Sequence, residues 1–337
     1  MPLTPARLLP VTRPLLGALA LAAGLALATA GTAAQAQGVA LVSSEKDHAL
    51  TILDLKTQAV TGTIATCKRP RHMRKTVDGK QLLVACGDSG QADVIDLATR
   101  KSVRKIALGD DPEIFDPSPD GKTLYVSNEE DSVVGVIDVA SGKRGSEIKV
   151  GGEPEGVLVS PDGKRLYVTS EVANLVHVID TASGKIVKDI PAGKRPRRFA
   201  ITPDGAQLWV SNELDASVTV IDTQALKVID TVRFEVKGAR AADITPVGIA
   251  MAKDGKRVYV GLGKANHVAF VDAASRKVTH QVLVGKRAWG LGLNAAETTL
   301  LVANGMSDDL TLVDTAAAKA LKTVKVGRVP HSVVVVE

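Results

Sequence analysis

The chain has 337 residues, 45% of them hydrophobic, and its 42 Lys and Arg against 37 Asp and Glu give a formal net charge of +5. This length is sufficient for one large all-β domain, even after an N-terminal leader is set aside. A charge excess this small gives no reason to expect a nucleic-acid-binding protein.

The N-terminus has the pattern of a secretory signal peptide. Two arginines precede an apolar run of small residues over 15–30, and Ala34-Gln35-Ala36 has the small residues of a cleavage site. We therefore expect residues 1–36 to be removed on export, with cleavage after Ala30 as an alternative, and 37–337 to form the mature domain. No later stretch is long and apolar enough for a spanning helix, so no membrane span is expected after cleavage.

The remainder of the chain is built from seven copies of one sequence unit. Successive units lie 42 residues apart, except for one spacing of 50, and a proline and an Asp-Gly pair recur in step with most of them. A period near 40 residues is typical of solenoids, propellers and arrays. The unit is marked by Val-Ile-Asp or a close variant, which ends at Asp54, Asp96, Asp138, Asp180, Asp222, Asp272 and Asp314.

One unit, read in chain order, predicts four short strands. Residues 156–160, 165–169, 175–180 and 185–190 are rich in β-branched residues and are separated by Asp-Gly, loop and Ser-Gly connections. Four antiparallel strands of this length make a propeller blade, so the fold is predicted to be an all-β, seven-bladed β-propeller.

The two ends of the mature chain predict how the ring closes. Residues 39–43 match the second strand of a unit and residues 331–336 match the first strand. The last strand is therefore expected to complete the blade that the N-terminus begins. The repeated aspartates of Val-Ile-Asp are expected to cap the following turn, since they occur in every unit and not at one site.

Charged residues on the connections between blades are the candidate site. Propeller topology places these connections and the loops after the second strands on one face, around the mouth of the central channel, and loops on a rigid frame commonly carry function. One sector of the mouth is acidic and its flanks are basic. The predicted ligand or partner face consists of Arg69, Arg71, His72, Asp111, Glu113, Glu153, Glu155, Arg195, Arg197, Arg198, Arg287, Trp289, Arg328 and His331.

Two interpretations of these charges stay open. Opposite charges on neighbouring blades could pair with each other, or they could form a polarised pocket for a small anion or a charged protein surface. Trp289 is either a packing residue or a ligand-stacking residue. The eight extra residues near 234–243, on the same face, are either a neutral insertion or a lid or partner contact.

Cys67 and Cys86 are the two cysteines of the chain. Because an exported protein favours oxidation, a disulfide between them is the preferred prediction. Copper binding together with nearby histidines and Met73 is the alternative, but no recognisable ligand spacing supports it. We predict no metal site and no catalytic residue, since no Gly-x-Ser-x-Gly, His-Glu-x-x-His or phosphate-loop motif occurs.

The repeats resemble the YVTN family of β-propellers through Tyr125-Val-Ser-Asn128, Tyr167-Val-Thr-Ser170 and Trp209-Val-Ser-Asn212. The blade connections look like those of the β-propeller proteins associated with PQQ-dependent catabolism. That resemblance is carried by Asp111-Pro-Glu-Ile-Phe115, Glu153-Pro-Glu-Gly156, Lys194-Arg-Pro-Arg197, Thr245-Pro-Val-Gly-Ile249, Gly263-Lys-Ala-Asn266 and Gly285-Lys-Arg-Ala-Trp289. It implies a periplasmic propeller encoded beside quinoprotein alcohol dehydrogenases, c-type cytochromes and an ABC export system.

The function expected from this resemblance is that of a non-enzymatic, monomeric periplasmic accessory protein. Its partner would be a quinoprotein dehydrogenase, a c-type cytochrome or an ABC-transporter component, and PQQ would enter only as a bound ligand or through a partner enzyme. One alternative is a binder of a small anion or cofactor at the channel mouth. The other is a propeller enzyme of the lactonase or amine-dehydrogenase-subunit type, for which Glu113, Glu153 and Glu155 would supply convergent carboxylates.

Overall fold

The computed structural model describes residues 1–5 and 38–337 of the chain. The expected signal peptide and its cleavage site fall almost entirely outside the described residues. The fold is that of the unit Ala34–Glu337. No helix long and apolar enough to cross a membrane occurs among the residues described.

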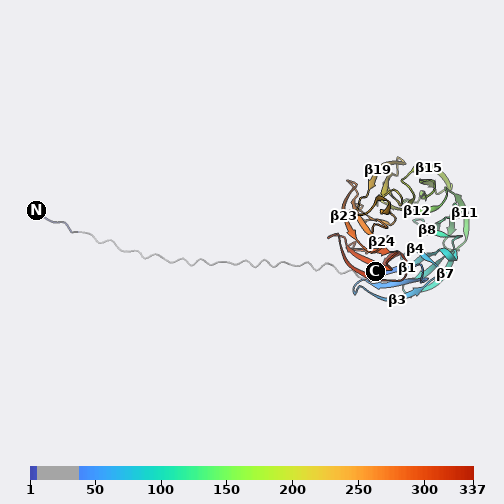
Figure 1. Cartoon of the computed structure of the whole chain (residues 1–337), viewed down its shortest axis with the longest axis horizontal. Helices are drawn as coiled ribbons and strands as arrows, with labels where there is room; N and C mark the ends of the chain where they lie inside the picture. The colour runs from blue at the N-terminus through green and yellow to red at the C-terminus, as the bar shows by residue number, and fades with distance from the viewer. Residues whose placement is uncertain (6–37) are drawn as a thin grey trace. The chain divides into compact units, whose positions relative to one another are not determined.

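Seven four-stranded antiparallel sheets form a ring, as Figure 1 shows, so the predicted seven-bladed β-propeller is confirmed. In each blade the strands follow one another from the central channel to the outer edge. The innermost strands are β4 (Pro70–Lys75), β8 (Pro112–Pro117), β12 (Pro154–Val159), β16 (Pro196–Ile201), β20 (Ile249–Met251), β24 (Ala288–Leu293) and β28 (Pro330–Val336).

The remaining strands repeat the same order in each blade. The second strands are β5 (Gln81–Cys86), β9 (Thr123–Asn128), β13 (Arg165–Ser170), β17 (Gln207–Asn212), β21 (Arg257–Gly261), β25 (Thr299–Asn304) and β1 (Val39–Ser44). The third strands are β6 (Gln91–Asp96), β10 (Val133–Asp138), β14 (Leu175–Asp180), β18 (Ser217–Asp222), β22 (His267–Asp272), β26 (Asp309–Asp314) and β2 (Ala49–Asp54). The outer strands are β7 (Lys101–Ala107), β11 (Arg144–Lys149), β15 (Lys185–Pro191), β19 (Lys227–Arg233), β23 (Lys277–Leu283), β27 (Lys319–Lys325) and β3 (Ala59–Ala65).

The ring closes through its last strand, as the two chain ends predict. β28 pairs antiparallel with β1, with Val336 opposite Val39 and Val333 opposite Val42. The blade of β28, β1, β2 and β3 therefore holds both ends of the domain and removes an open sheet edge. We call it blade 1, and blades 2 to 7 follow in chain order from β4.

The repeated aspartates cap turns, as expected. The Asp180 carboxylate accepts hydrogen bonds from the backbone N–H and the hydroxyl of Ser183, at 2.9 and 2.7 Å. Equivalent backbone hydrogen bonds follow the third strand of every other blade. These aspartates are structural acceptors at or near the surface that stabilise the turn into each outer strand.

The core lies between neighbouring blades, because the middle strands bury both faces against the next sheet. Trp209, Tyr167 and Phe115 are among the largest fully buried side chains. The loop after β19, which holds the eight extra residues and the 3-10 turn η2 (Ala241–Asp243), is anchored in this core by Phe234 and Val236. A second 3-10 turn, η1 (Gly87–Ser89), follows β5.

Candidate functional site

Three equivalent positions from each blade gather at the channel mouth. The inner ring is the second residue of the innermost strand or its equivalent: Arg71, Glu113, Glu155, Arg197, Val247, Trp289 and His331. The entrance ring lies two residues earlier: Arg69, Asp111, Glu153, Arg195, Thr245, Arg287 and Val329. The loop ring follows the second strand: Glu45, Gly87, Glu129, Glu171, Glu213, Gly263 and Gly305.

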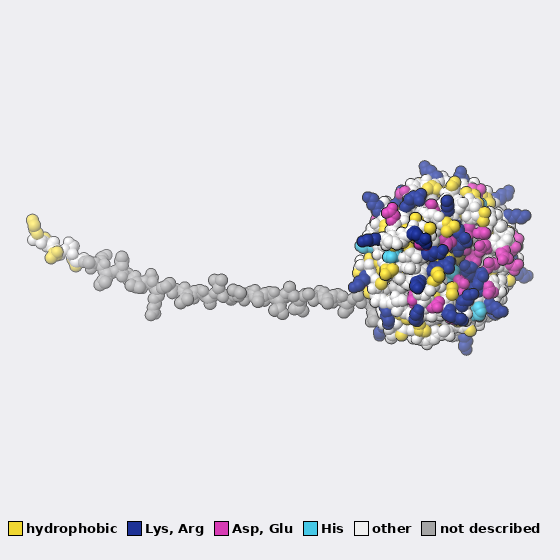
Figure 2. Space-filling model, in the orientation of Figure 1, with side chains coloured by type: hydrophobic (Ala, Val, Ile, Leu, Met, Phe, Trp, Pro, Cys, Tyr) yellow, Lys and Arg dark blue, Asp and Glu magenta, His cyan; other side chains and the backbone are white. Residues whose placement is uncertain are grey.

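Local backbone geometry positions the entrance ring. Asp111, Glu153 and Arg195 have φ of 36°, 51° and 54°, in the left-handed region that non-glycine residues seldom adopt. The chain thus makes a tight turn immediately before β8, β12 and β16. In Figure 2 the acidic side chains gather on one side of the centre of the ring, with basic side chains beside them.

Opposite charges pair between blades 2 and 3, which is the first of the two interpretations left open by the sequence. Arg69 pairs with Asp111, and Arg71 pairs with the buried carboxylate of Glu113. The Nε atom of Arg71 also lies 3.7 Å from Oε1 of Glu45. These arginines are therefore largely committed to neighbouring carboxylates.

Arg197 is the centre of a second ion-pair cluster. Its guanidinium lies 3.1 Å from Oε1 of Glu155 and 3.6 Å from Oε2 of Glu213, and it pairs closely with Glu171. Arg195 lies 2.6 Å from the other oxygen of Glu171. Burial, together with the charge of Glu155, raises the pKa of Glu171 to about 7 against the opposing effect of Arg197.

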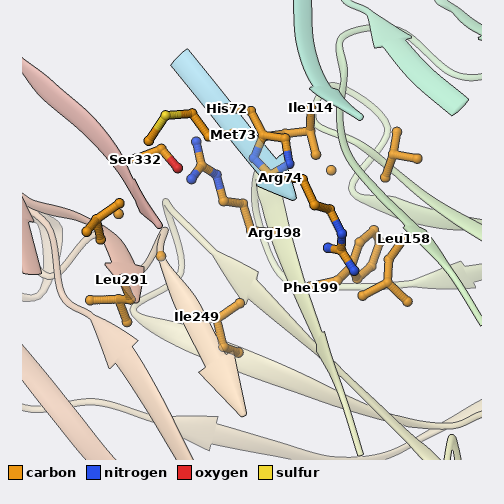
Figure 3. A pocket seen from close by; sticks show the side chains of 15 residues that line it. His72, Met73, Arg74, Ile114, Leu158, Arg198, Phe199, Ile249, Leu291 and Ser332 are labelled. Atoms are coloured by element: carbon orange, nitrogen blue, oxygen red, sulfur yellow. The ribbon is translucent and has the colours of Figure 1, made fainter. Parts of the chain in front are cut away.

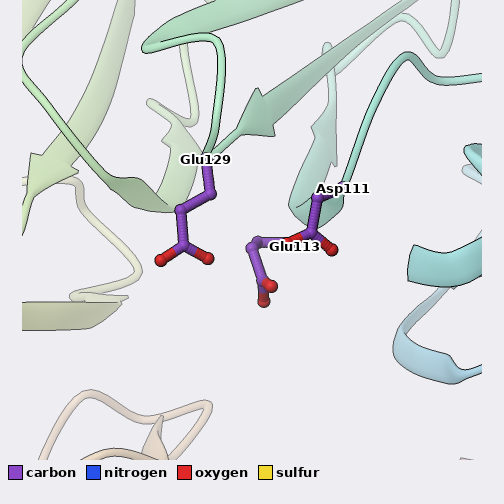
Figure 4. Close-up of side chains that lie close together, drawn as sticks. All are labelled: Asp111, Glu113 and Glu129. Atoms are coloured by element: carbon purple, nitrogen blue, oxygen red, sulfur yellow. The ribbon is translucent and has the colours of Figure 1, made fainter.

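The acidic sector holds two carboxylate triads that share Glu129. One is Asp111, Glu113 and Glu129, which Figure 4 shows close together, and the other is Glu129, Glu153 and Glu171. In each triad one oxygen per residue lies within 4.8 Å of the others. Burial first, and then Glu155, raises the pKa of Glu129. Carboxylate oxygens at this spacing could hold a hard divalent cation such as Ca²⁺ or Mg²⁺.

The opposite side of the mouth is formed by Trp289 and His331. The guanidinium of Arg287 lies 4.1 Å from the Trp289 ring centroid, and that of Arg197 lies 5.5 Å away. Nη2 of Arg198 is 3.1 Å from Nε2 of His331. Burial, and then the charges of Arg198 and Arg71, hold the pKa of His331 well below its usual range.

A cavity of about 220 Å³ lies in the central channel, deeper than the mouth. His72, Arg74, Arg198 and Ser332 line it together with apolar side chains, as Figure 3 shows. Burial, and then Arg198, lowers the pKa of His72 to about 3, and the ring packs edge-on against Phe115 at 4.9 Å. His72 is thus a neutral residue of the channel wall, deeper than the mouth but close to the charge of Arg198.

Arg328 is a predicted site residue that the structure does not bring to the mouth. Its side chain is 67% exposed and its Nε lies 2.6 Å from Oδ1 of Asp47. The prediction from the sequence was wrong because Arg328 lies one residue before Val329, which is the entrance-ring position of this blade. The side chain of Arg328 points outward from the connection.

The Cys67–Cys86 disulfide is present, with a Cα–Cα distance of 5.8 Å. It joins the start of the Arg69–Arg71 connection to the end of β5 and so fixes one wall of the mouth. A persistent disulfide fits an extracellular or periplasmic location.

Four mouth residues were missed by the sequence analysis. The loop ring contains Glu45, Glu129, Glu171 and Glu213. These four are half of the acidic residues in the three rings of the mouth. Glu129, Glu171 and Glu213 are spaced by the same 42 residues as the strands. That spacing was the available signal, since the loops after the second strands were expected on this face.

Comparisons with known proteins agree with the fold and redirect the function. Residues 184–336 match the model of "Lactonase, 7-bladed beta-propeller", and residues 120–208 match that of "YNCE-like beta-propeller". Both matches place the chain among the β-propellers. They do not single out the PQQ-associated subgroup, so that resemblance stays a prediction. No curated protein sequence matches the chain significantly.

Three solved structures illustrate the structural likeness. Kuenenia stuttgartiensis hydrazine synthase is 26% identical, with a TM-score of 0.74 over 82% of this chain and 92% of that one. The periplasmic gluconolactonase PpgL of Pseudomonas aeruginosa is 21% identical, with a TM-score of 0.76 over 89% and 99%. The dihydro-heme d1 dehydrogenase NirN is 17% identical, with a TM-score of 0.66 over 88% and 75%.

The expectation of a non-enzymatic accessory protein of PQQ-dependent catabolism is wrong as the main interpretation. The family model that covers blades 5 to 7 is that of a lactonase, which favours the enzyme alternative. The error came from the search for linear motifs. Side chains that meet at the mouth of a propeller come from separate blades and form no contiguous signature.

Proposed function

We propose that the protein is a lactonase-type hydrolase that opens a small cyclic ester at the channel mouth. The observation that carries the proposal is the environment of Glu129. It is half-buried at the junction of both carboxylate triads, and it makes no ion pair within 4 Å among the described residues. The other three glutamates of the loop ring are ion-paired.

Lactone hydrolysis requires an activated water and stabilisation of the negative charge that develops on the carbonyl oxygen. A carboxylate whose pKa is raised by burial suits the first task at near-neutral pH. A divalent cation held by the triads would supply the same activation by polarising water or the carbonyl. The arginines beside the acidic sector provide positive charge for the second task.

The lactonase model match and the gluconolactonase among the similar structures support this reaction class. The signal-peptide pattern of residues 1–36 and the Cys67–Cys86 disulfide support the further proposal that it takes place in the periplasm. No electron-transfer partner is required, because hydrolysis needs only water as co-substrate.

The test is hydrolysis of a panel of γ- and δ-lactones, including glucono-δ-lactone, followed by acid release. We expect Glu129→Gln to lower kcat by about 10²–10⁴-fold, as loss of a general base does. Glu235→Gln, at an exposed carboxylate on the loop after β19, is the matched control. Chelation by EDTA separates a metal-assisted from a metal-free route. Inertness towards the whole panel with and without added Ca²⁺, Mg²⁺ and Mn²⁺ would sink the proposal.

A further inference from the structure

Two buried N–H donors at the mouth have no partner. Trp289 is 7% exposed and His331 is 2% exposed. The indole Nε1 of Trp289 and the Nδ1 of His331 make no hydrogen bond within the described part of the chain. The two ring centroids are 6.0 Å apart. A buried donor left unpaired costs about 1–3 kcal/mol, so we expect an acceptor from outside the chain at this place.

The hydrogen bond from Arg198 assigns the His331 tautomer. A guanidinium only donates, so Nε2 of His331 must accept and the proton must be on Nδ1. The depressed pKa keeps the ring neutral, so Nδ1 remains a donor across the ordinary pH range. Glu45 lies 3.9 Å from Nε2, beyond hydrogen-bond distance, and does not change this assignment.

Both residues line one cavity of about 160 Å³, which we call the mouth pocket. Arg287 lies in its wall and makes no ion pair within 4 Å among the residues described. Arg71, also in the wall, pairs with Glu113. The lining thus presents two neutral donors and, in Arg287, a cation that stacks on Trp289 without an ion pair, with Glu45 as the one carboxylate.

We propose that the mouth pocket is a carboxylate subsite, in which Trp289 Nε1–H and His331 Nδ1–H each donate to one oxygen of a small hydroxy acid and Arg287 balances its charge. The role of this subsite in holding the reaction product rests on the proposed function. In lactone hydrolysis water adds to the carbonyl carbon and the ring C–O bond breaks; one proton of the water ends on the ring oxygen and the other is released to solvent. The carbonyl oxygen and the added oxygen become the product carboxylate, which the two donors hold once the product has moved from Glu129 to the opposite side of the mouth.

Three variants test the two donors separately. Trp289→Phe keeps an aromatic ring under Arg287 and removes the indole N–H. His331→Gln can keep an acceptor for Arg198 at the place of Nε2 while removing the donor at Nδ1. His331→Asn can keep a donor at the place of Nδ1 while removing the acceptor for Arg198. We expect the first two to weaken carboxylate binding about tenfold, the equivalent of one hydrogen bond to a charged group, and the Asn variant to bind within a few-fold of the unaltered protein.

The probes are gluconate, lactate and acetate in titration calorimetry, with inorganic phosphate as the competing oxyanion. Arg104→Gln on the outer strand β7 is the control for lost positive charge. The chain has two tryptophans, so a gluconate-induced change in tryptophan fluorescence that is lost in Trp289→Phe is a second readout. If that variant does not fold, His331→Gln carries the same test.

Unchanged gluconate affinity in Trp289→Phe and His331→Gln overturns the subsite, as does the absence of binding of all three carboxylates. Phosphate binding as tight as that of the best carboxylate overturns the assignment of the ligand class. Carboxylate binding without lactone hydrolysis leaves the subsite standing and removes the proposed function. If both variants hydrolyse lactones as fast as the unaltered protein and no carboxylate binds, the proposed function stands and the subsite is removed.

Discussion

Removal of the Arg197 guanidinium should destabilise the protein strongly. The side chain is 7% exposed and contacts Glu155, Glu171 and Glu213, two of which are themselves almost fully buried. Arg197→Met keeps most of the volume and leaves these carboxylates without their cation. Breaking a buried ion pair from one side costs about 3–5 kcal/mol, and we expect a loss of unfolding free energy in this range at pH 8.

The pH dependence of that loss is the sharper test. Without Arg197, burial raises the folded-state pKa values of Glu155 and Glu171 above the unfolded value of about 4.3. A raised carboxyl pKa gives stability that is present at low pH and lost as pH rises through the folded value. The deficit of Arg197→Met should therefore be smaller at pH 5 than at pH 8, and Glu171→Gln added to it should restore part of the stability at pH 8.

The assay is urea unfolding of the protein at both pH values, followed by circular dichroism. Arg233→Met is the matched control, because this arginine is 67% exposed and lies 3.7 Å from Asp215. Exposed pairs of that kind are worth about 0–1 kcal/mol. A deficit below about 1 kcal/mol for Arg197→Met, or one that is equal at pH 5 and pH 8, would refute the ion-cluster reasoning.

Three further predictions concern the disulfide, the titration of the mouth and the channel packing. Cys67→Ala with Cys86→Ala should lower the unfolding free energy by about 3 kcal/mol, since the bond closes a loop with a sequence separation of 19. Reduction of the unaltered protein in the same titration should give a similar loss, and no loss by either route would contradict this. Because the pKa of Glu171 is raised to about 7, the protein should lose stability as pH rises from about 4.3 towards 7. Glu171→Gln should flatten this part of the stability profile, and an unchanged slope would count against the shift. A Cβ on Gly290 would lie 2.2 Å from the carbonyl oxygen of His331. Gly290→Ala should therefore cost about 1–3 kcal/mol and lower the melting temperature, whereas an unchanged melting temperature would show that the two innermost strands are not held this closely.

Much of the fold was predictable because its determinants are local and repeated. The Val-Ile-Asp strand and the Asp-capped turn recur in every blade, so each unit carries its own strand order and turn chemistry. The match of residues 39–43 and 331–336 to complementary strands was enough to predict the closure of blade 1. The disulfide was predictable too, since the chain holds two cysteines on the same blade.

The site was predictable as a location but not as an arrangement. Arg197 and Glu155 could be placed at the mouth from the 42-residue spacing, whereas the sharing of Glu129 between two triads could not. The 42-residue spacing of Glu129, Glu171 and Glu213 places Glu129 at the mouth but does not show which carboxylates it faces. The outward position of Arg328 was equally hidden, since it depends on the direction of one side chain in a tight turn.

By itself the sequence determined the seven-bladed architecture, the closing strand and the face on which charges gather, because strand periodicity and turn chemistry act within one unit. Only the tertiary structure decided which charges pair, that His331 presents Nδ1–H and that Trp289 and His331 share a cavity. These depend on side chains from different blades meeting across the ring, where burial and neighbouring charge set hydrogen-bond partners and pKa values. A linear pattern does not encode those distances.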